Sequence, residues 1–164
     1  MLLGVLGLAV DIGWSYFTKV QAQSAADAAA MAAAVYAANG GPISCGANNV
    51  NCAGDTACAY PAAAATDAFT TACAYAAANG FSNHGNQTVT VSANTTSSGV
   101  TGNSPSYWVK ATVGIRPYAL FGPFSGFRQF TVSAASTAAV AYYGVGACVY
   151  VLDPTSAASL TMAG

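Results

Sequence analysis

The sequence has no glutamate, one histidine (His84) and four basic residues among its 164 positions. Charged residues make up 5% of the chain, whereas soluble domains carry about 25%. Four basic residues cannot form the positive stripe that neutralises nucleic-acid phosphates, so we expect no nucleic-acid partner. Without glutamate, and with one histidine, most acid–base pairs and histidine metal sites cannot be built. We therefore expect no enzymatic activity, no catalytic residues, no metal and no cofactor.

Small and hydrophobic residues take the place of the missing charges. The chain contains 38 alanines and 17 glycines, and hydrophobic residues account for 54% of it. Disordered chains are poor in hydrophobic residues and rich in charge, so this composition disfavours disorder. A monomer with so little charge also has little to keep its copies apart in water. The classes that remain are membrane-attached, secreted and polymeric proteins.

The first 39 residues predict one long helix, because alanine is abundant and no proline occurs before Pro42. Asn39, Gly40 and Gly41, followed by Pro42, supply the expected stop signals. At 1.5 Å per residue such a helix extends about 58 Å, so it must project out of its domain. We therefore predict a hydrophobic-to-amphipathic anchor or assembly helix over residues 1–39 and an extracytoplasmic, cysteine-bearing head over residues 40–164.

The apolar start of this helix has two interpretations. Ten apolar residues precede Asp11, fewer than the roughly 20 that cross a bilayer. The aromatic residues that follow, with a lysine after them, are typical of the interfacial end of a span. We favour a longer native hydrophobic segment whose first part is missing, and the alternative is a buried core helix. The candidate anchor or assembly residues are Leu3, Leu6, Val10, Asp11, Trp14, Phe17, Lys19 and Asp27.

Asp11 is the most unusual charge, because a lone carboxylate in an apolar segment needs a partner. Either it contacts a partner inside a membrane or filament core, or it lies at the bilayer surface beside Trp14 and Lys19. Lys19, Gln23 and Asp27 follow at intervals of four and predict a polar ladder on one helix face. Small residues also recur with helical spacing, which indicates either close self-association or a plain alanine spacer; they are Gly4, Gly7, Ala26, Ala30 and Ala34.

The rest of the chain predicts one more alanine-rich helix and then strands. We expect a loop over residues 40–55 and a helix from about Thr56 or Pro61 to Ala78, closed by Asn79 and Gly80. Beyond Gly80 the hydrophobic period changes to two, which predicts strands. Those strands cover residues 88–93, 107–115, most of 127–143, and 147–152, with loops at 94–105 and 117–126. Helices followed by consecutive strands predict an α+β fold, with an antiparallel sheet of about three to five strands packed on the helices in a pilin-like layout.

Four of the five cysteines cluster within 29 residues of an apparently exported chain. We predict disulfides among Cys45, Cys52, Cys58 and Cys73, which leaves Cys148 over. Zinc is the alternative, but no C-x-x-C spacing occurs. Three pairings are possible, and the sequence does not choose between them. On one straight helix Cys58 and Cys73 would lie about 22 Å apart, so they pair only if the chain bends before Pro61.

The stretch Leu8–Ala34 (LAVDIGWSYFTKVQAQSAADAAAMAAA) resembles the N-terminal signature of TadG-like (TadE/TadG-type) proteins of the bacterial Tad (Flp-pilus) system. In that signature a hydrophobic anchor runs into VD.G..Y......Q.AADAAALA. The family's anchor is usually longer than the segment before Asp11, and its members usually continue beyond the end of this chain. The residues that carry the resemblance are Val10, Asp11, Gly13, Tyr16, Gln23 and Ala25–Ala30, followed in order by Tyr75–Phe81, Tyr107–Val109, Phe130–Ala134 and Cys148–Thr155.

The resemblance implies a non-enzymatic, exported structural protein of a bacterial surface appendage, located in the envelope or at the cell surface and linked to pilus assembly or adhesion. The expected partners are other copies of the chain, Tad pilus components, and the membrane through the N-terminal helix. The alternative is the repeating subunit of an extracellular filament, with that helix forming the filament core. A third possibility, a membrane-tethered binding or hydrolytic domain, needs a polar cluster that the sequence does not offer.

Overall fold

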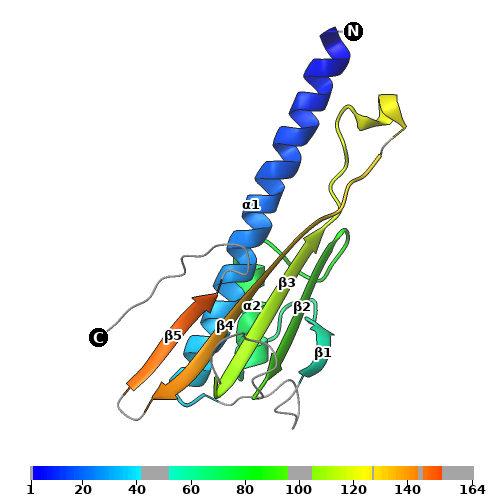
Figure 1. The fold of residues 1–164 in the computed structure, drawn as a ribbon. Coiled ribbons are helices and arrows are strands. Elements are labelled where there is room, and N and C mark those ends of the chain that lie inside the picture. The colour runs from blue at the N-terminus through cyan, green and yellow to red at the C-terminus, as the bar shows by residue number, and fades with distance from the viewer. Residues whose placement is uncertain (1, 42–51, 96–104, 127, 144–145, 153–164) are drawn as a thin grey trace.

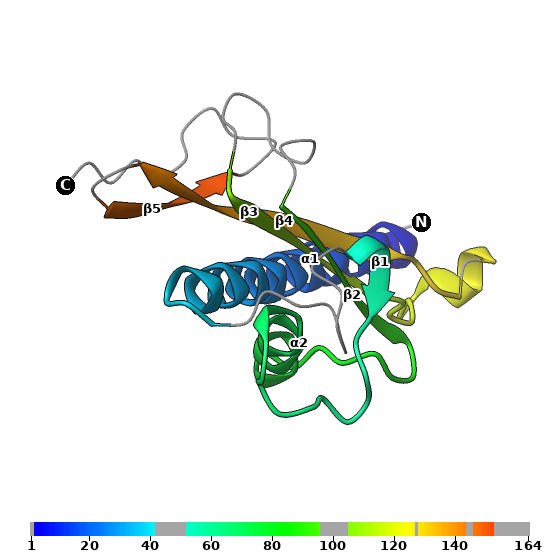
Figure 2. The ribbon, with the colours of Figure 1, turned by 90° about the horizontal axis from the view of Figure 1, so that it is seen from below.

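The computed structural model of the chain describes residues 2–41, 52–95, 105–126, 128–143 and 146–152. Its five strands form one sheet in the order β1-β2-β3-β4-β5, and every neighbouring pair is antiparallel. The helices α1 and α2 lie together on one face of this sheet (Figures 1 and 2). The predicted α+β class, with an antiparallel sheet packed on helices, is confirmed.

The long N-terminal helix is confirmed as α1 (Leu2–Ala38). It ends where the sequence predicts, because Gly40 adopts a left-handed conformation with φ of +79° and the amide of Gly41 donates to the carbonyl oxygen of Tyr36 at 3.0 Å. The C-terminal half of α1 crosses the sheet, whereas its N-terminal half extends past the strand ends (Figure 1). One helix therefore has two environments.

The second helix, α2 (Ala68–Ala78), begins later than predicted. Asp67 determines its start through a capping box, in which the Asp67 carboxylate accepts from the backbone amide of Thr70 at 2.7 Å and the Thr70 hydroxyl accepts from the backbone amide of Asp67 at 3.1 Å. The alanines between Pro61 and Asp67 stay outside the helix despite their high helix propensity. The predicted end is confirmed, since Asn79 caps the helix and Gly80 follows with φ of +85°.

The predicted loop over residues 40–55 is wrong at its end, because β1 (Cys52–Ala57) pairs there with the edge of β2 (Gln87–Asn94). The register of this pair is irregular between Cys52 and Thr56. No alternation of apolar residues marks β1, so pairing with a neighbouring strand decides its conformation. The other part of that predicted loop, residues 42–51, lies outside the described residues.

The remaining strands follow the predicted pattern. They are β2, β3 (Tyr107–Ile115), β4 (Val132–Tyr143) and β5 (Gly146–Leu152). Alternate residues of β3 are buried beneath the helices from Tyr107 to Val113, as the period of two predicts. One boundary differs, because β4 begins at Val132 and not near residue 127. Residues 116–126 and 128–131 instead belong to a long β3–β4 loop that contains the 3-10 turn η2 (Gly122–Ser125).

A disulfide joins Cys58 to Cys73, with an S–S distance of 2.04 Å and a Cα–Cα distance of 5.6 Å. It forms because the chain turns between the end of β1 and the start of α2, which places Cys58 beside the first turns of the helix. The sequence required a bend before Pro61 for this pairing, and in the structure the helix begins only at Ala68, so Cys58 lies outside it. Of the other predicted disulfide candidates, Cys45 lies outside the described residues and Cys52 is the first residue of β1. Cys148 lies in β5, opposite Ala141 of β4.

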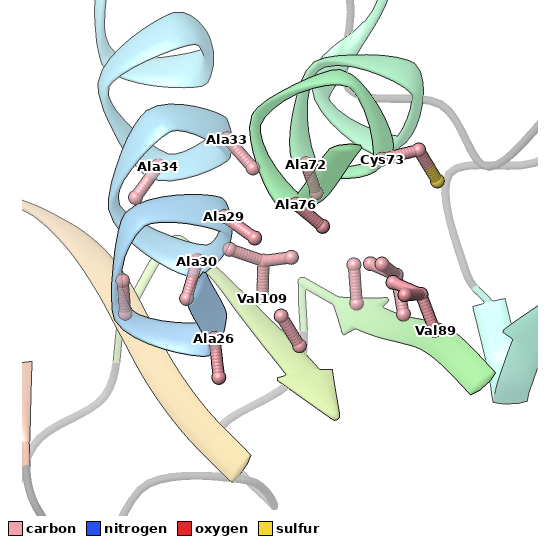
Figure 3. Packing of buried hydrophobic residues seen from close by; sticks show 14 of the residues in the cluster. Ala26, Ala29, Ala30, Ala33, Ala34, Ala72, Cys73, Ala76, Val89 and Val109 are labelled. Carbon is pink, nitrogen blue, oxygen red and sulfur yellow. The ribbon is translucent and has the colours of Figure 1, made fainter. Parts of the chain in front are cut away.

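The core is lined mostly by alanine where the two helices and the sheet meet. Ala29 and Ala33 project from α1 toward α2, and Ala72 and Ala76 of α2 lie across from them (Figure 3). Small side chains let the backbones approach closely. The alanine positions marked for self-association, Ala26, Ala30 and Ala34, have no exposed surface, so they pack within the protein itself. The buried alanines of α1 are Ala22, Ala25, Ala26, Ala29, Ala30, Ala33, Ala34 and Ala37.

Candidate functional site

The N-terminal half of α1 exposes large apolar side chains all around its axis. Eight of them between Leu6 and Val20 have exposed fractions of 44% to 70%. Residues two apart on a helix point to nearly opposite sides, so this set cannot be one amphipathic stripe. A helix that is apolar all round is typical of a buried helix or a membrane span. The eight residues are Leu6, Leu8, Val10, Ile12, Trp14, Tyr16, Phe17 and Val20.

Among the predicted anchor residues, the exposed apolar set contains Leu6, Val10, Trp14 and Phe17. Trp14 and Phe17 also contact each other, with ring centroids 5.8 Å apart. Leu3 belongs to α1, but its side chain is outside the part of the structure that is described. The three polar members of the predicted set, Asp11, Lys19 and Asp27, all form hydrogen bonds within the chain.

Asp11 has a partner within its own chain, which neither sequence interpretation included. Its carboxylate receives the backbone amides of three consecutive residues of the β3–β4 loop. The amide of Leu120 donates to Oδ1 at 2.8 Å, that of Gly122 donates to Oδ2 at 2.8 Å, and that of Phe121 donates to Oδ2 at 3.1 Å. Consecutive amides at the start of a turn form a concave site for an anion. We call this contact the Asp11 clamp.

A close packing contact accompanies the Asp11 clamp one helical turn away. Gly7 is buried, and a Cβ atom at this position would lie 2.8 Å from the Cβ of Phe121. No side chain fits there unless Phe121 moves, so glycine at position 7 lets the loop reach the helix. Gly4, the other small residue of this segment, has nothing within 4 Å of such a Cβ. The two glycines therefore differ in role despite their regular spacing.

Of the predicted polar ladder of Lys19, Gln23 and Asp27, the structure shows the contact between Gln23 and Asp27, whereas Lys19 contacts β4. The Gln23 amide donates to Asp27 Oδ1 at 2.9 Å, and it also lies 3.4 Å from the carbonyl oxygen of Ala135. The Lys19 ammonium donates to the carbonyl oxygen of Ser133 at the start of β4. These contacts therefore join α1 to the first residues of β4, at the level where the helix extends beyond the sheet.

An open groove of about 670 Å³ lies beside this junction, between α1 and the chain that leads into β4. Asp11, Tyr16 and Lys19 line one wall, and Phe130 and Thr131 line the other. The groove lies between the Asp11 clamp and the Lys19 contact. It therefore separates the two points at which the segment before β4 is fastened to the helix.

The β3–β4 loop is the part of this candidate site that the sequence did not indicate. The segment 117–126 was predicted only as an aromatic, turn-rich connection, yet among the described residues it supplies the backbone amides that bind Asp11. The available signal was its composition, because Tyr118, Leu120 and Phe121 are unusually apolar for a connecting loop. In the structure these three side chains are 68%, 61% and 44% exposed.

Within the described residues, no helix is both long enough and apolar enough to cross a membrane. Residues 1–38 match the model of the family described as Putative Flp pilus-assembly TadE/G-like. The TadE/G-like resemblance of the sequence is thereby confirmed over this N-terminal segment. The match covers 38 of the 164 residues, and the description of that family refers to Flp pilus assembly. No curated protein and no solved structure matches the chain.

Proposed function

We propose that this chain is a non-enzymatic structural component of a bacterial Tad pilus system, held in the cell envelope by the N-terminal half of α1. The observation that carries the proposal is the exposed apolar set between Leu6 and Val20, which lies inside the segment that matches the TadE/G-like family. Burying one large apolar side chain contributes about 2 kcal/mol. Eight half-exposed side chains therefore favour burial by an amount on the order of 10 kcal/mol.

The head supports this role by its construction. Helix α1 continues from the exposed apolar segment directly into the alanine-lined core, so the anchor and the head share one rigid element. The disulfide between Cys58 and Cys73 strengthens the layer that covers this part of α1. Disulfides are typical of proteins outside the cytoplasm. The sheet would then act as a rigid platform for contacts with other copies or with Tad pilus components.

A second candidate is the repeating subunit of an extracellular filament. The observation that favours it is the charge content of 5%, because filament subunits bury much of their surface against copies of themselves. In that arrangement the same exposed apolar set packs against neighbouring subunits and not against lipid. The two candidates therefore agree on the part of the chain that is buried and differ in what covers it.

The test is to shear producing cells and to compare the sheared material with the washed membranes. Recovery of the chain in membranes, resistant to alkaline washing, supports the anchored role. Uniform filaments composed mainly of this chain, seen by electron microscopy and identified by mass spectrometry, support the filament role and contradict the anchor. Recovery only as a dispersed soluble protein contradicts both.

A pair of double variants makes this test specific to the N-terminal half of α1. Leu6→Glu with Val10→Glu places two charges in the exposed apolar set, and we expect it to release the chain from the membrane or filament. Val35→Glu with Tyr75→Glu adds the same two charges at positions of the head that are 40% and 51% exposed. This control should leave the fractionation unchanged. Equal release by both double variants would contradict a specific role for the N-terminal half.

A further inference from the structure

The β3–β4 loop carries an apolar surface of its own. Among the loop residues whose side chains are described, Tyr118, Leu120 and Phe121 are the most exposed large apolar ones, with exposed fractions of 68%, 61% and 44%. Connecting loops usually present polar side chains to water. This loop leaves the sheet at the end of β3 and extends alongside the N-terminal half of α1 (Figure 1). Its apolar residues therefore lie next to the exposed apolar set of the helix.

The Asp11 clamp determines the position of this loop along the axis of α1. Three backbone amides from Leu120 to Gly122 bind the Asp11 carboxylate, and Phe121 packs on Gly7. Gly7 and Asp11 are four residues apart, which is about 6 Å along the axis. The tip of the loop thus lies beside the apolar segment itself. Whatever covers α1 at this level must also reach the tip of the loop.

Positive charge gathers beside this apolar tip, with Lys19 and Arg116 toward the head and Arg128 opposite Ala119. Three of the four basic residues of the chain are here, all with exposed side chains: Lys19, Arg116 and Arg128. Arg116 and Arg128 belong to the two arms of the loop, which are paired by the bridge between Tyr118 and Gln129 and by the amide of Ala119 donating to the carbonyl oxygen of Arg128 at 3.0 Å. Lys19 lies two helical turns from Asp11 toward the head and contacts Ser133. The Asp11 carboxylate is already occupied by backbone amides.

We propose that the β3–β4 loop is a second membrane-contacting element, in which an anionic phospholipid bilayer covers Leu120 and Phe121 together with the N-terminal half of α1. Lys19, Arg116 and Arg128 then lie at the level of the lipid phosphates, where cations are attracted by anionic headgroups. Tyr118, with Trp14 and Tyr16 of the helix, supplies the amphipathic rings that are typical of the membrane interface.

Charge decides between lipid and a second copy of the chain as the covering partner. Two copies aligned side by side would bring Lys19, Arg116 and Arg128 of one copy close to the same cations of the other, which is repulsive. Anionic headgroups carry the complementary charge. This inference rests on the proposed anchoring by α1. Its test must therefore measure lipid contact of the loop and of the helix separately.

The test uses the full chain in vesicles of phosphatidylcholine and phosphatidylglycerol whose acyl chains carry bromine, a short-range quencher of tryptophan fluorescence. In the first protein, Leu120→Trp is combined with Trp14→Phe and Trp108→Phe, so that all emission comes from the loop. We expect bromine to remove most of this emission. The matched control places Tyr75→Trp in the same background, at a position of α2 that is 51% exposed. Its emission should be unaffected.

Lipid contact of the helix is measured independently in Trp108→Phe, where Trp14 is the single tryptophan and its quenching by bromine is recorded. Quenching of Trp14 without quenching at position 120 overturns the loop proposal and leaves the anchored helix standing. Absence of quenching at both positions overturns the anchoring, and this proposal with it. Protection of position 120 from water without bromine quenching, in a sample that sediments as an oligomer, means that a second copy covers the loop, and it also overturns the proposal.

Two further variants test the mechanism. Asp11→Asn replaces one acceptor oxygen by a donor and should free the loop, so quenching at position 120 falls while quenching of Trp14 persists. Arg116→Gln with Arg128→Gln should weaken quenching at position 120 in anionic vesicles only. If neither variant changes quenching at position 120, the Asp11 clamp and the cations do not position the loop, and the proposal in this form is wrong.

Discussion

The two halves of α1 have similar hydrophobic character and opposite relations to the rest of the molecule. Between Ala22 and Ala37 the helix buries eight alanines against the sheet and α2. Between Leu6 and Val20 it exposes eight larger apolar side chains on all sides. Helix propensity favours the alanine-rich half, whereas the N-terminal half contains many glycine, β-branched and aromatic residues of lower helix propensity. Side-chain size separates their roles.

Small side chains suit the half that folds the head, because α1 and α2 can then approach each other and the sheet closely. Large side chains would suit a half that an external partner covers, as we propose, because they contribute more apolar area per residue. The Asp11 clamp lies in the N-terminal half of α1, which we call the outward-facing half. The loop is therefore attached to this half and not to the core. Variants that change one half and spare the other test this division.

The largest effect on stability is expected from removing the disulfide between Cys58 and Cys73, which ties α2, the helix packed on the buried half of α1, to the segment after β1. Cys58→Ala with Cys73→Ala opens a link between residues 15 apart, and a loop of this length contributes about 3 kcal/mol to stability. The free energy of unfolding of the head, measured with denaturant, should fall by this amount, and the unfolding midpoint should move to lower denaturant concentration. Trp14 quenching by brominated lipid should stay unchanged. An unchanged unfolding midpoint would show that the disulfide does not support the layer over α1.

The same enlargement of an alanine should have opposite consequences in the two halves. Ala29 is fully buried between the helices and the sheet, so Ala29→Leu overpacks the core and should destabilise the head by about 2 kcal/mol. Ala9 is exposed in the outward-facing half, so Ala9→Leu should leave unfolding unchanged. Thermal unfolding monitored by circular dichroism compares the two variants. Equal destabilisation would remove the distinction between the halves.

Alkaline pH should destabilise the head through Tyr107, which is 2% exposed. Burial raises the pKa of Tyr107, and the nearby charge of Asp67 acts in the same direction. Above pH 10 the unfolded chain loses the phenol proton while the folded protein keeps it, so stability falls by up to about 1.4 kcal/mol per pH unit. This contribution is fully present below pH 10.

Chemical unfolding between pH 9 and 11 tests that expectation. Tyr107→Phe should reduce the loss of stability above pH 10, because the variant has no phenol to ionise. Tyr16→Phe, at a position of the outward-facing half that is 70% exposed, is the matched control and should retain the pH dependence of the unaltered chain. Identical pH profiles for both variants would contradict the role of Tyr107.

The smallest effect on global stability is expected from the Asp11 clamp. Asp11→Asn weakens a charge-assisted set of hydrogen bonds and should cost about 1 to 2 kcal/mol locally, confined to the loop. Hydrogen exchange at the amides of residues 120–122 should accelerate, while exchange in β2 and β3 stays the same. Faster exchange throughout the sheet would mean that the Asp11 clamp supports the head and not only the loop.

The sequence predicted those parts of the fold that depend on local periodicity and strong stop signals. The alanine-rich helix with its glycine end and the alternating residues of β3 are examples. It failed where a distant contact decides the conformation. The start of α2 depends on the capping box of Asp67, and β1 exists because β2 offers it an edge. The irregular segment between them also made the Cys58–Cys73 pairing possible, which the sequence left open.

The candidate site divides in the same way. The apolar set of α1 is visible in the sequence, because it needs only residue types and spacing. The partner of Asp11 is not visible, since the donors are backbone amides 109 to 111 residues away and backbone amides carry no sequence signature. The predicted roles of Asp11 as a membrane or filament contact stay predictions, and the structure adds the loop as its partner within the chain.

The most direct test of the account compares the two native tryptophans, because Trp14 lies in the outward-facing half of α1 and Trp108 lies in β3. The emission of Trp14 is measured alone in Trp108→Phe, and that of Trp108 alone in Trp14→Phe. Both measurements use the full chain in vesicles that carry brominated acyl chains. The account predicts strong quenching of Trp14 and none of Trp108. Unquenched Trp14 emission in vesicles that retain the protein, or equal quenching of both tryptophans, would contradict it.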